Sequence, residues 1–285
     1  MKKFKESFMK YVFFISALMS MLALVLICYF LFSIGIPAIG KIGINNFLLG
    51  QHWLPSDVPP SFGILPMILG SIYITLGAIL IGVPLGVLTA VFMARFCPPK
   101  LYKIFKPATD LLAGIPSIIY GFFGMIVLVP IIQEITGGTG STMLTASILL
   151  GLMILPTIIG IAESSIRAVP EEYYEGALAL GASHQRSVFF VLLPAASSGV
   201  FAAIVLGIGR AIGETMAVVM VAGNQARMPA GIFKGVRTLT ANIVLEMGYA
   251  AELHRDALIA TGMVLFTFIL ILNVIFFTLK RRAIR

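Results

Sequence analysis

The chain has 285 residues, of which 59% are hydrophobic and 11% charged, and its mean hydropathy is +1.03. A soluble domain must cover itself with polar side chains, so this composition excludes one and indicates a protein that crosses a membrane several times. The net charge of +8 does not indicate nucleic-acid binding, because the basic residues are spread along the chain without a clustered patch or interleaved aromatic residues.

Six apolar stretches are long enough to cross a hydrocarbon core about 30 Å thick. They must be helices, because backbone groups in lipid have no water to bond and no stretch alternates like a barrel strand. We predict an all-α integral membrane protein with one transmembrane domain over residues 1–285, its core at about 64–280, and 1–63 as first span and outer loop. The predicted spans are 11–36, 64–94, 108–132, 144–166, 201–223 and 256–279.

The first span follows several lysines, as a secretory signal peptide does. Its apolar run exceeds the roughly 7 to 15 residues of a signal peptide and lacks an A-x-A cleavage site, so we expect it to be retained. The outer loop after it contains the only tryptophan, Trp53, which we predict to be an interfacial anchor, with docking of a partner as the less favoured alternative for this loop.

The short loops set the orientation, because lysine and arginine favour the cytoplasmic side. This rule places both termini in the cytoplasm. The loop over 224–255 breaks the trend, either because it meets an anion or because it is an ordinary solvated loop. The basic residues on the predicted cytoplasmic side are Lys2, Lys3, Lys5, Lys10, Arg95, Lys100, Lys103, Lys106, Lys280, Arg281, Arg282 and Arg285.

Small residues and prolines mark the second and third spans. Gly70, Gly77, Gly82 and Gly86 would allow a neighbouring helix to approach closely, which is ordinary helix packing. Near the start of the third span, Pro116 would kink the helix beside the hydroxyl of Ser117, and such a pair can line a path.

The connection between spans four and five has a helical pattern rather than that of a loop. Pro170 suits a helix N-terminus, and the two glutamates that follow it favour the helix dipole. Gly181 then interrupts the pattern, and a second segment runs to Pro194. We predict a short helix, a turn and another short helix beneath the membrane, either as a plain interfacial anchor or as a docking element.

The residue spacing in this connection favours docking. Glu175-Gly176-Ala177, three residues, Gly181, nine residues and Val191-x-Leu193-Pro194 resemble the EAA loop of ABC-importer permeases, with Gly176 and Val191 as conservative departures. In that family the element is the coupling helix, which seats in a groove of a cytoplasmic ATPase. The resemblance implies the same role here, with Ala and Gly giving a bare face and Glu175 pairing with a basic residue of the partner.

Sites for other chemistry are lacking in the sequence. No G-x-x-x-x-G-K-[S/T] motif occurs, so ATP hydrolysis with Mg²⁺ is expected on a separate subunit, and we predict neither an enzyme nor a cofactor in this chain. Cys28 and Cys97 exclude a disulfide framework, and no Cys/His cluster has metal-ligand spacing. A membrane enzyme is disfavoured because no nucleophile and base pair is evident.

The stretch GIGRAIGETMAVVMVAGN over 207–224 places Arg210 and Glu214 inside an apolar span. A charge at a span centre costs about 2.5 to 3.5 kcal/mol, so it must be compensated. Four residues apart on one helix, the two side chains would share a face. They would form either a structural ion pair or part of an anion path, in which Glu214 weakens the binding of the anion by Arg210. We favour the path, because a guanidinium presents paired donors that match an oxyanion.

This stretch, together with LLAGIPSIIYGFFG and RTLTANIVLEMG, is similar to the permeases of phosphate-specific ABC importers of the PstC type, over about residues 60–280. The resemblance implies a bacterial inner-membrane permease that imports phosphate by alternating access. It also implies a second homologous permease, a dimeric ATPase and an extracytoplasmic phosphate-binding protein as partners. The site residues it indicates are Arg210, Glu214 and Thr215, with Ser117 added for its kinked position.

Alternatives remain at this stage. The substrate can be another oxyanion, such as sulfate or phosphonate, or the protein can be a secondary transporter without an ATPase, against which the EAA-like loop argues. Several polar residues have plainer interpretations: Asp110 and Glu163 as solvated helix ends, His184 as a surface contact, His52 and His254 as loop residues, and Arg237, Thr238 and Thr240 as a less favoured substrate contact.

Overall fold

The computed structural model describes residues 2–283, whose regular elements are helices and one two-stranded hairpin. Arg285, counted above among the basic residues, lies outside them. The helices are α1 (Lys2–Ile42), α2 (Ile44–Leu48), α3 (Leu65–Val91), α4 (Pro99–Gly114), α5 (Ser117–Phe123), α6 (Val129–Thr136), α7 (Met143–Arg167), α8 (Glu171–Ala179), α9 (His184–Ser187), α10 (Leu193–Ala195), α11 (Ser197–Gly213), α12 (Met216–Val221), α13 (Leu239–Glu246) and α14 (Glu252–Ala283). Strands β1 (Trp53–Leu54) and β2 (Ser61–Phe62) pair antiparallel, and π-helical turns cover Phe92–Phe96, Gly124–Leu128 and Val188–Leu192.

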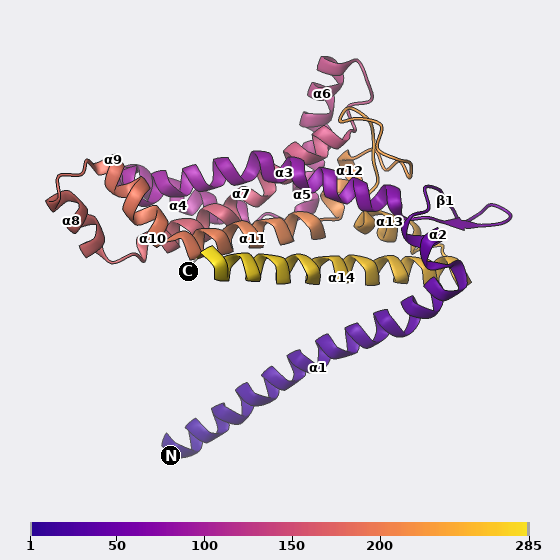
Figure 1. The fold of residues 1–285 in the computed structure, drawn as a ribbon, viewed down its shortest axis with the longest axis horizontal. Helices are drawn as coiled ribbons and strands as arrows, with labels where there is room; N and C mark the ends of the chain where they lie inside the picture. The colour runs from indigo at the N-terminus through magenta and orange to yellow at the C-terminus, as the bar shows by residue number, and fades with distance from the viewer. Residues whose placement is uncertain (1, 284–285) are drawn as a thin grey trace.

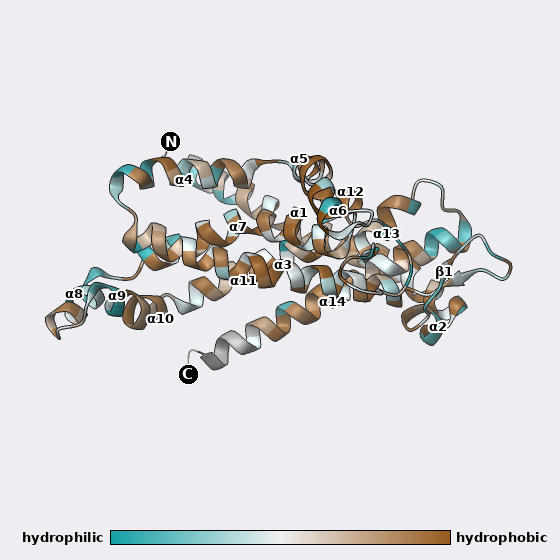
Figure 2. Cartoon of the chain, turned by 90° about the horizontal axis from the view of Figure 1, so that it is seen from above, coloured by the Kyte–Doolittle hydropathy of each residue, from teal (hydrophilic) through white to brown (hydrophobic). Residues whose placement is uncertain are grey.

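Most helices form an elongated bundle with two distinct ends, and α1 leaves it at an angle from the end that carries β1 (Figure 1). One end holds α8 and α9 and is called the coupling end below; the other holds β1, β2 and α13 and is called the hairpin end. Both termini of the described chain lie towards the coupling end. Hydrophilic residues gather at the two ends, and hydrophobic residues dominate the helices between them (Figure 2). This distribution suits a bundle whose middle lies in a membrane.

The predicted fold class is confirmed. Within residues 2–283, five helical segments are long and apolar enough to span a membrane: Phe8–Ile42, Leu65–Phe96, Ser117–Thr136, Met143–Arg167 and Glu252–Phe276. The sixth is a bent pair, His184–Ala195 with Ser197–Gly213, whose two parts meet at 70°.

The third span begins later than predicted. Residues 99–114 form a separate helix, α4, in which no residue is buried. The chain then turns extended at Ile115, with ψ 127°, because the ring of Pro116 disfavours the helical conformation in the residue before it. The predicted range 108–132 was therefore wrong at its start, and the apolar span runs from Ser117 to Thr136.

The fifth span is interrupted where the sequence suggested continuity. Helix α11 ends at Gly213, Glu214 is extended with φ −69° and ψ 133°, and α12 starts at Met216. Gly213 weakens the helix here, and the Glu214 carboxylate stabilises the break by accepting a hydrogen bond from the Ala217 N–H at 3.2 Å. The predicted continuous helix over 201–223 was wrong.

The close approach predicted for the second span is confirmed. A Cβ added at Gly82 would lie 2.6 Å from Ile154 Cγ1, and one at Gly86 would lie 2.8 Å from Ile158 Cγ2, both on α7. Gly77 touches Ser147 of α7 in the same way, and Gly70 meets the backbone of Arg237. The pairing of α3 with α7, whose apolar window is 61% buried, therefore forms the centre of the core.

Replacing Gly82 by alanine is expected to destabilise the bundle by about 1–3 kcal/mol, because the added methyl group overpacks this interface. Thermal unfolding of the detergent-solubilised chain measures the effect. Gly160→Ala on α7 is the matched control, since a Cβ there meets no atom within 4 Å. Equal unfolding temperatures for the two variants would contradict the packing argument.

The hairpin end corrects the interpretation of Trp53. Its side chain is only 4% exposed, and its ring lies edge-on to Phe62 with centroids 5.7 Å apart. The indole N–H donates to Glu246 Oε2 at 2.7 Å. Trp53 is therefore a buried core residue rather than an interfacial anchor.

Candidate functional site

Arg210 lies on α11, three residues before the helix ends, and its side chain is half-buried against α7. Its Nη1 donates a hydrogen bond to Thr157 Oγ1 at 3.1 Å. Thr157 follows Pro156, which lies inside α7 and lacks the N–H that a helix residue would donate there. The polar partner of Arg210 thus lies where Pro156 interrupts the backbone hydrogen bonding of the neighbouring span.

Glu214 does not neutralise Arg210. Within residues 2–283, no ion pair joins the two side chains, and the helix break removes the shared face that their spacing suggested. The Glu214 carboxylate caps α12 at Ala217, while its carbonyl accepts from Thr240 Oγ1 at 3.0 Å. The predicted pairing on one helical face was wrong.

The lack of an acidic partner distinguishes Arg210 from the other arginines packed into the bundle. Arg95 pairs with Glu171 at 2.8 Å, Arg167 with Glu163, and Arg237 with Glu246 at 2.5 Å. Arg210 has only the hydroxyl of Thr157 among the part of the chain that the structure describes. A guanidinium carries five N–H donors, so most of its capacity and all of its charge remain for an anion.

Ser117 and Thr215 stand at the starts of α5 and α12, two helices that pack against each other. The contact is close, since a Cβ at Gly121 would lie 2.9 Å from the Cα of Ala217. Both hydroxyl residues are half-buried, and Thr215 Oγ1 donates to the Gly213 carbonyl at 3.3 Å. The structure brings the two segments together, but no hydrogen bond between described residues links either hydroxyl to Arg210.

Thr157 is the site residue that the sequence reasoning missed. The available signal was a threonine directly after a proline in the middle of a predicted span. Both features suggest a polar point in a helix, but neither indicates which neighbouring helix it faces.

The connection over 170–194, called the coupling segment below, has the predicted geometry of helix, turn and helix. Helix α8 runs from Glu171 to Ala179, Gly181 adopts φ +83°, and the side chain of Ser183 caps α9 by accepting from the Arg186 N–H. The chain then continues through a π-helical turn to α10, which contains Leu193 and Pro194.

The exposed face of α8 differs in one residue from the prediction. Glu175 and Gly176 are exposed, whereas Ala177 is 9% exposed and faces the protein itself. Beside them, Tyr173 is 54% exposed and Leu180 is 92% exposed. The surface offered at the coupling end is therefore made by an acid, a bare glycine and two large apolar side chains.

Three aromatic and charged residues tie α8 to the rest of the bundle. Arg95, from the π-helical turn after α3, donates to Glu171 and lies 5.8 Å from the ring centre of Tyr174. The Tyr174 hydroxyl is 2.8 Å from His184 Nδ1, so His184 is an internal contact rather than a surface one. Movement of α8 is thereby linked directly to the end of α3.

Replacing Gly181 by alanine is expected to cost about 1–2 kcal/mol, because a positive φ is unfavourable for a residue with a Cβ. Gly176→Ala is the matched control: both glycines face open space, but only Gly181 has a positive φ. We expect the unfolding temperature of the detergent-solubilised chain to fall in Gly181→Ala and to be retained in Gly176→Ala. An equal fall in both would locate the effect in the surface rather than in the turn.

Glu163 is not the solvated helix end that the sequence suggested. It is 2% exposed and accepts from the Tyr102 hydroxyl at 2.9 Å and from Arg167, while Lys106 Nζ lies 3.5 Å away. Burial raises the pKa of Tyr102, and the hydrogen bond to Glu163 raises it further. Burial alone would lower the pKa of Lys106, but the Asp110 hydrogen bond and the Glu163 charge outweigh it, so that pKa is raised. The cluster attaches α4 to α7.

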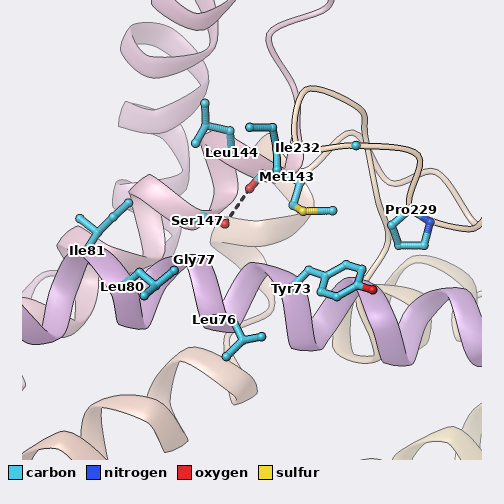
Figure 3. A pocket seen from close by; sticks show the side chains of 11 residues that line it. Tyr73, Leu76, Gly77, Leu80, Ile81, Met143, Leu144, Ser147, Pro229 and Ile232 are labelled. Carbon is cyan, nitrogen blue, oxygen red and sulfur yellow. Dashed lines mark hydrogen bonds between the residues drawn. The ribbon is translucent and has the colours of Figure 1, made fainter.

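An apolar cavity of about 600 Å³ lies between α3, α7 and the loop over 229–232 (Figure 3). Ser147 within it is bonded to the Met143 carbonyl at 2.9 Å, and Tyr73 stands at its margin. No charged side chain lines it. This cavity suits hydrocarbon and is not the site of an anion. Its lining residues are Tyr73, Leu76, Gly77, Leu80, Ile81, Met143, Leu144, Ser147, Pro229, Gly231 and Ile232.

Comparison with known families gives a match over residues 82–285 to the binding-protein-dependent transport system inner membrane component. The chain belongs to this family. It is thus a multi-pass permease subunit of an ABC importer in the inner membrane, as the EAA-like spacing predicted.

Relatives cover most of the chain. A probable ABC transporter permease protein, YqgH, of Bacillus subtilis is 39% identical over 243 residues, 84% of this chain and 79% of that protein. The phosphate transport system permease protein PstC of Mesorhizobium japonicum is 36% identical over 242 residues, 78% and 73% of the two chains. A probable PstC of Methanocaldococcus jannaschii is 32% identical over 279 residues, 90% and 88%. The predicted resemblance to PstC-type permeases is confirmed.

Solved structures share the fold. An inward-facing MetNI methionine ABC transporter matches with a TM-score of 0.63 at 19% identity, covering 78% of this chain and 96% of that one. A bacterial alginate ABC transporter, in complex with an alginate pentasaccharide-bound periplasmic protein, matches with a TM-score of 0.61 at 16% identity, covering 93% and 94%. At these identities the likeness concerns the fold alone.

Proposed function

We propose that this permease carries inorganic phosphate into the cytoplasm by alternating access. The observation that supports it most is Arg210, a half-buried guanidinium in a membrane span with a hydroxyl partner and no carboxylate among the described residues. Intramembrane ionisable residues mark substrate paths, and a guanidinium matches the oxygens of phosphate. Several relatives are named phosphate transport permeases, which favours phosphate over other anions.

The chemistry at this site requires release as well as capture. Bound phosphate would accept hydrogen bonds from the Arg210 guanidinium, either in place of Thr157 Oγ1 or together with it. The Thr157 hydroxyl can itself donate to an oxyanion. Glu214, at the helix break nearby in sequence, opposes the anion and limits how tightly the site holds it. Ser117 and Thr215 are proposed to line the path, because they lie at the starts of the two packed helices α5 and α12.

The proposed assembly contains a second homologous permease, a dimeric cytoplasmic ATPase and an extracytoplasmic phosphate-binding protein. The ATPase uses ATP and Mg²⁺ and contacts the coupling segment, where Glu175 and Gly176 are exposed. Gly181 forms the turn after α8, and Leu193 and Pro194 lie where the chain leads back into the membrane span. This chain lacks a Walker A sequence, acts as a single domain and needs no cofactor of its own. In this proposal the coupling end and both termini lie in the cytoplasm, as the distribution of lysine and arginine predicts.

A second candidate is import of another oxyanion. Arg210 would bind sulfate or phosphonate through the same paired donors, since their oxygens present the same geometry. Only a measured preference separates these substrates.

Uptake of radiolabelled phosphate into proteoliposomes tests the proposal. The vesicles carry the complete importer, with the binding protein outside and ATP inside. We expect ATP-dependent phosphate uptake that excess sulfate or phosphonate does not reduce. Uptake suppressed by a second anion would assign that anion instead, and uptake without ATP would indicate a secondary transporter.

A further inference from the structure

Glu246, the last residue of α13, holds a buried carboxylate at the hairpin end, and its side chain is 7% exposed. Three side chains from elsewhere in the chain meet it. The Trp53 indole donates to Oε2 at 2.7 Å, His254 Nε2 lies 2.9 Å from the same oxygen, and Arg237 Nη1 donates to Oε1 at 2.5 Å. The substrate path proposed above includes none of these four residues.

The partners come from three separate segments. Trp53 belongs to β1 of the hairpin, His254 to the first turn of α14, and Arg237 to the loop that precedes α13. The rings of Trp53 and His254 also meet edge-on, with centroids 6.0 Å apart. One carboxylate therefore fastens the hairpin to α13 and α14. These elements gather at one end of the bundle (Figure 1).

Arg237 is held in place by this network through three hydrogen bonds. Beyond Glu246, its Nη1 donates to Asn242 Oδ1 and its Nε to the Asn224 carbonyl, both at 3.0 Å. The backbone of Arg237 also packs directly on Gly70 of α3. An arginine held in this way, with its charge paired to Glu246, orients its neighbours.

The other end of α13 reaches the break in the fifth span. Thr238 caps the helix by accepting from the Ala241 N–H, and its hydroxyl is 3.0 Å from that of Thr240. Thr240 Oγ1 in turn donates to the Glu214 carbonyl at 3.0 Å. A helix of eight residues is about 12 Å long and moves as a body, so it connects Glu246 directly to the segment that follows Arg210.

We propose that Glu246 is a positioning residue for transport, which transmits movement of the hairpin over 53–62 through α13 to Glu214. Its charged hydrogen bonds are directional, so a shift of the hairpin displaces the carboxylate and the helix that bears it. The driving event is the docking of the extracytoplasmic binding protein at the hairpin end, and in this respect the inference rests on the proposed function.

The test uses Trp53→Phe in the complete importer reconstituted in proteoliposomes. The substitution keeps an aromatic ring in the hairpin core and removes the N–H that Glu246 accepts. The readouts are basal ATP hydrolysis, hydrolysis stimulated by the loaded phosphate-binding protein, phosphate uptake and the yield of assembled complex. We expect the maximal stimulated rate and uptake to fall about 10-fold, the loss that one hydrogen bond to a charged group can give.

A change in coupling is distinguished from a change in assembly by what stays constant. Basal hydrolysis, complex yield and the half-saturating concentration of binding protein are expected to match the wild type. Ser61→Ala is the matched control, because it removes the hairpin's own bond from Ser61 Oγ to the His52 carbonyl, 2.9 Å long, and leaves Glu246 untouched. This control is expected to behave as the wild type.

Two results would overturn the inference. One is wild-type stimulation and uptake in Trp53→Phe. The other is a parallel fall of complex yield, basal hydrolysis and stimulation, which would make the network a structural fastening only. Stimulated hydrolysis tests the inference whatever anion the binding protein carries, whereas absence of phosphate uptake by the wild type would count against the proposed function instead.

Discussion

Replacing Arg210 by lysine is expected to reduce phosphate uptake about 10- to 100-fold while the importer still assembles. Lysine keeps the positive charge but presents a compact ammonium in place of the planar fork that binds two oxygens at once. Hydrogen bonds to charged groups are worth about 1.5–3 kcal/mol, and losing one accounts for a change of this size. ATP-dependent uptake of labelled phosphate into proteoliposomes measures it.

Two further variants define what Arg210 does. Arg210→Ala removes both the positive charge and the paired N–H donors of the guanidinium, so we expect a larger loss of uptake than with Arg210→Lys. Thr157→Val removes the hydroxyl that Arg210 donates to and leaves the guanidinium in place, so we expect a smaller loss than either. Uptake by Arg210→Lys and Arg210→Ala equal to that of the wild type would remove the residue from the path.

The helical architecture followed from composition, because only helices satisfy backbone groups in lipid and the apolar runs have the required length. Glycine spacing also correctly predicted that a neighbouring helix approaches the second span closely, and the structure shows that this helix is α7, with Ile154 and Ile158 packed on Gly82 and Gly86. Span boundaries were less predictable. Residues 108–114 and 214–223 are apolar enough to continue a span, but Pro116 and the Gly213–Glu214 pair end the helices locally.

The candidate site was predictable in its residues and not in its contacts. A lone arginine in an apolar span is conspicuous in any sequence, so Arg210 was found. Its relation to Glu214 was inferred from helical spacing, which fails as soon as the backbone leaves the helix. Thr157, 53 positions away, depends on which face of α7 meets α11, and one sequence carries no information on that.

Buried acids were the least predictable residues of all. Glu163 stands at a predicted span end and Glu246 in the predicted outer loop over 224–255, where most carboxylates are hydrated, yet as whole residues they are 2% and 6% exposed. Each is buried because nearby cations neutralise it: Glu163 meets Lys106 of α4 and Arg167, one turn further along α7, and Glu246 meets Arg237. The i, i+4 spacing of Glu163 and Arg167 is visible in the sequence, whereas the contacts with Lys106 and between Arg237 and Glu246 arise from tertiary packing and leave no such signal.

Replacing Glu163 by glutamine is expected to destabilise the permease by about 3 kcal/mol. The side chain of Glu163 is 2% exposed, and its carboxylate is the acceptor for the Tyr102 hydroxyl and for Arg167. An amide of the same shape keeps the packing but loses the charge, and breaking a buried pair by removing one partner costs about 3–5 kcal/mol. The lower end applies because Lys106 and Arg167 are 30% and 43% exposed and can be hydrated.

Thermal unfolding in detergent measures this effect, and a fall in Tm of roughly 6–12 °C corresponds to it at about 2–4 °C per kcal/mol. Asp110→Asn is the matched control, because it breaks the exposed pair with the same Lys106, whose atoms are 3.2 Å apart, and such pairs are worth about 0.3–0.5 kcal/mol. Equal falls in Tm for Glu163→Gln and Asp110→Asn would mean that the cluster of Tyr102, Lys106, Glu163 and Arg167 stabilises the protein through Lys106 alone. A large fall in Tm for Glu163→Gln alone would instead show that the buried carboxylate holds α4 against α7. The carboxylate would thereby also fix the position of the chain just before the third span begins at Ser117.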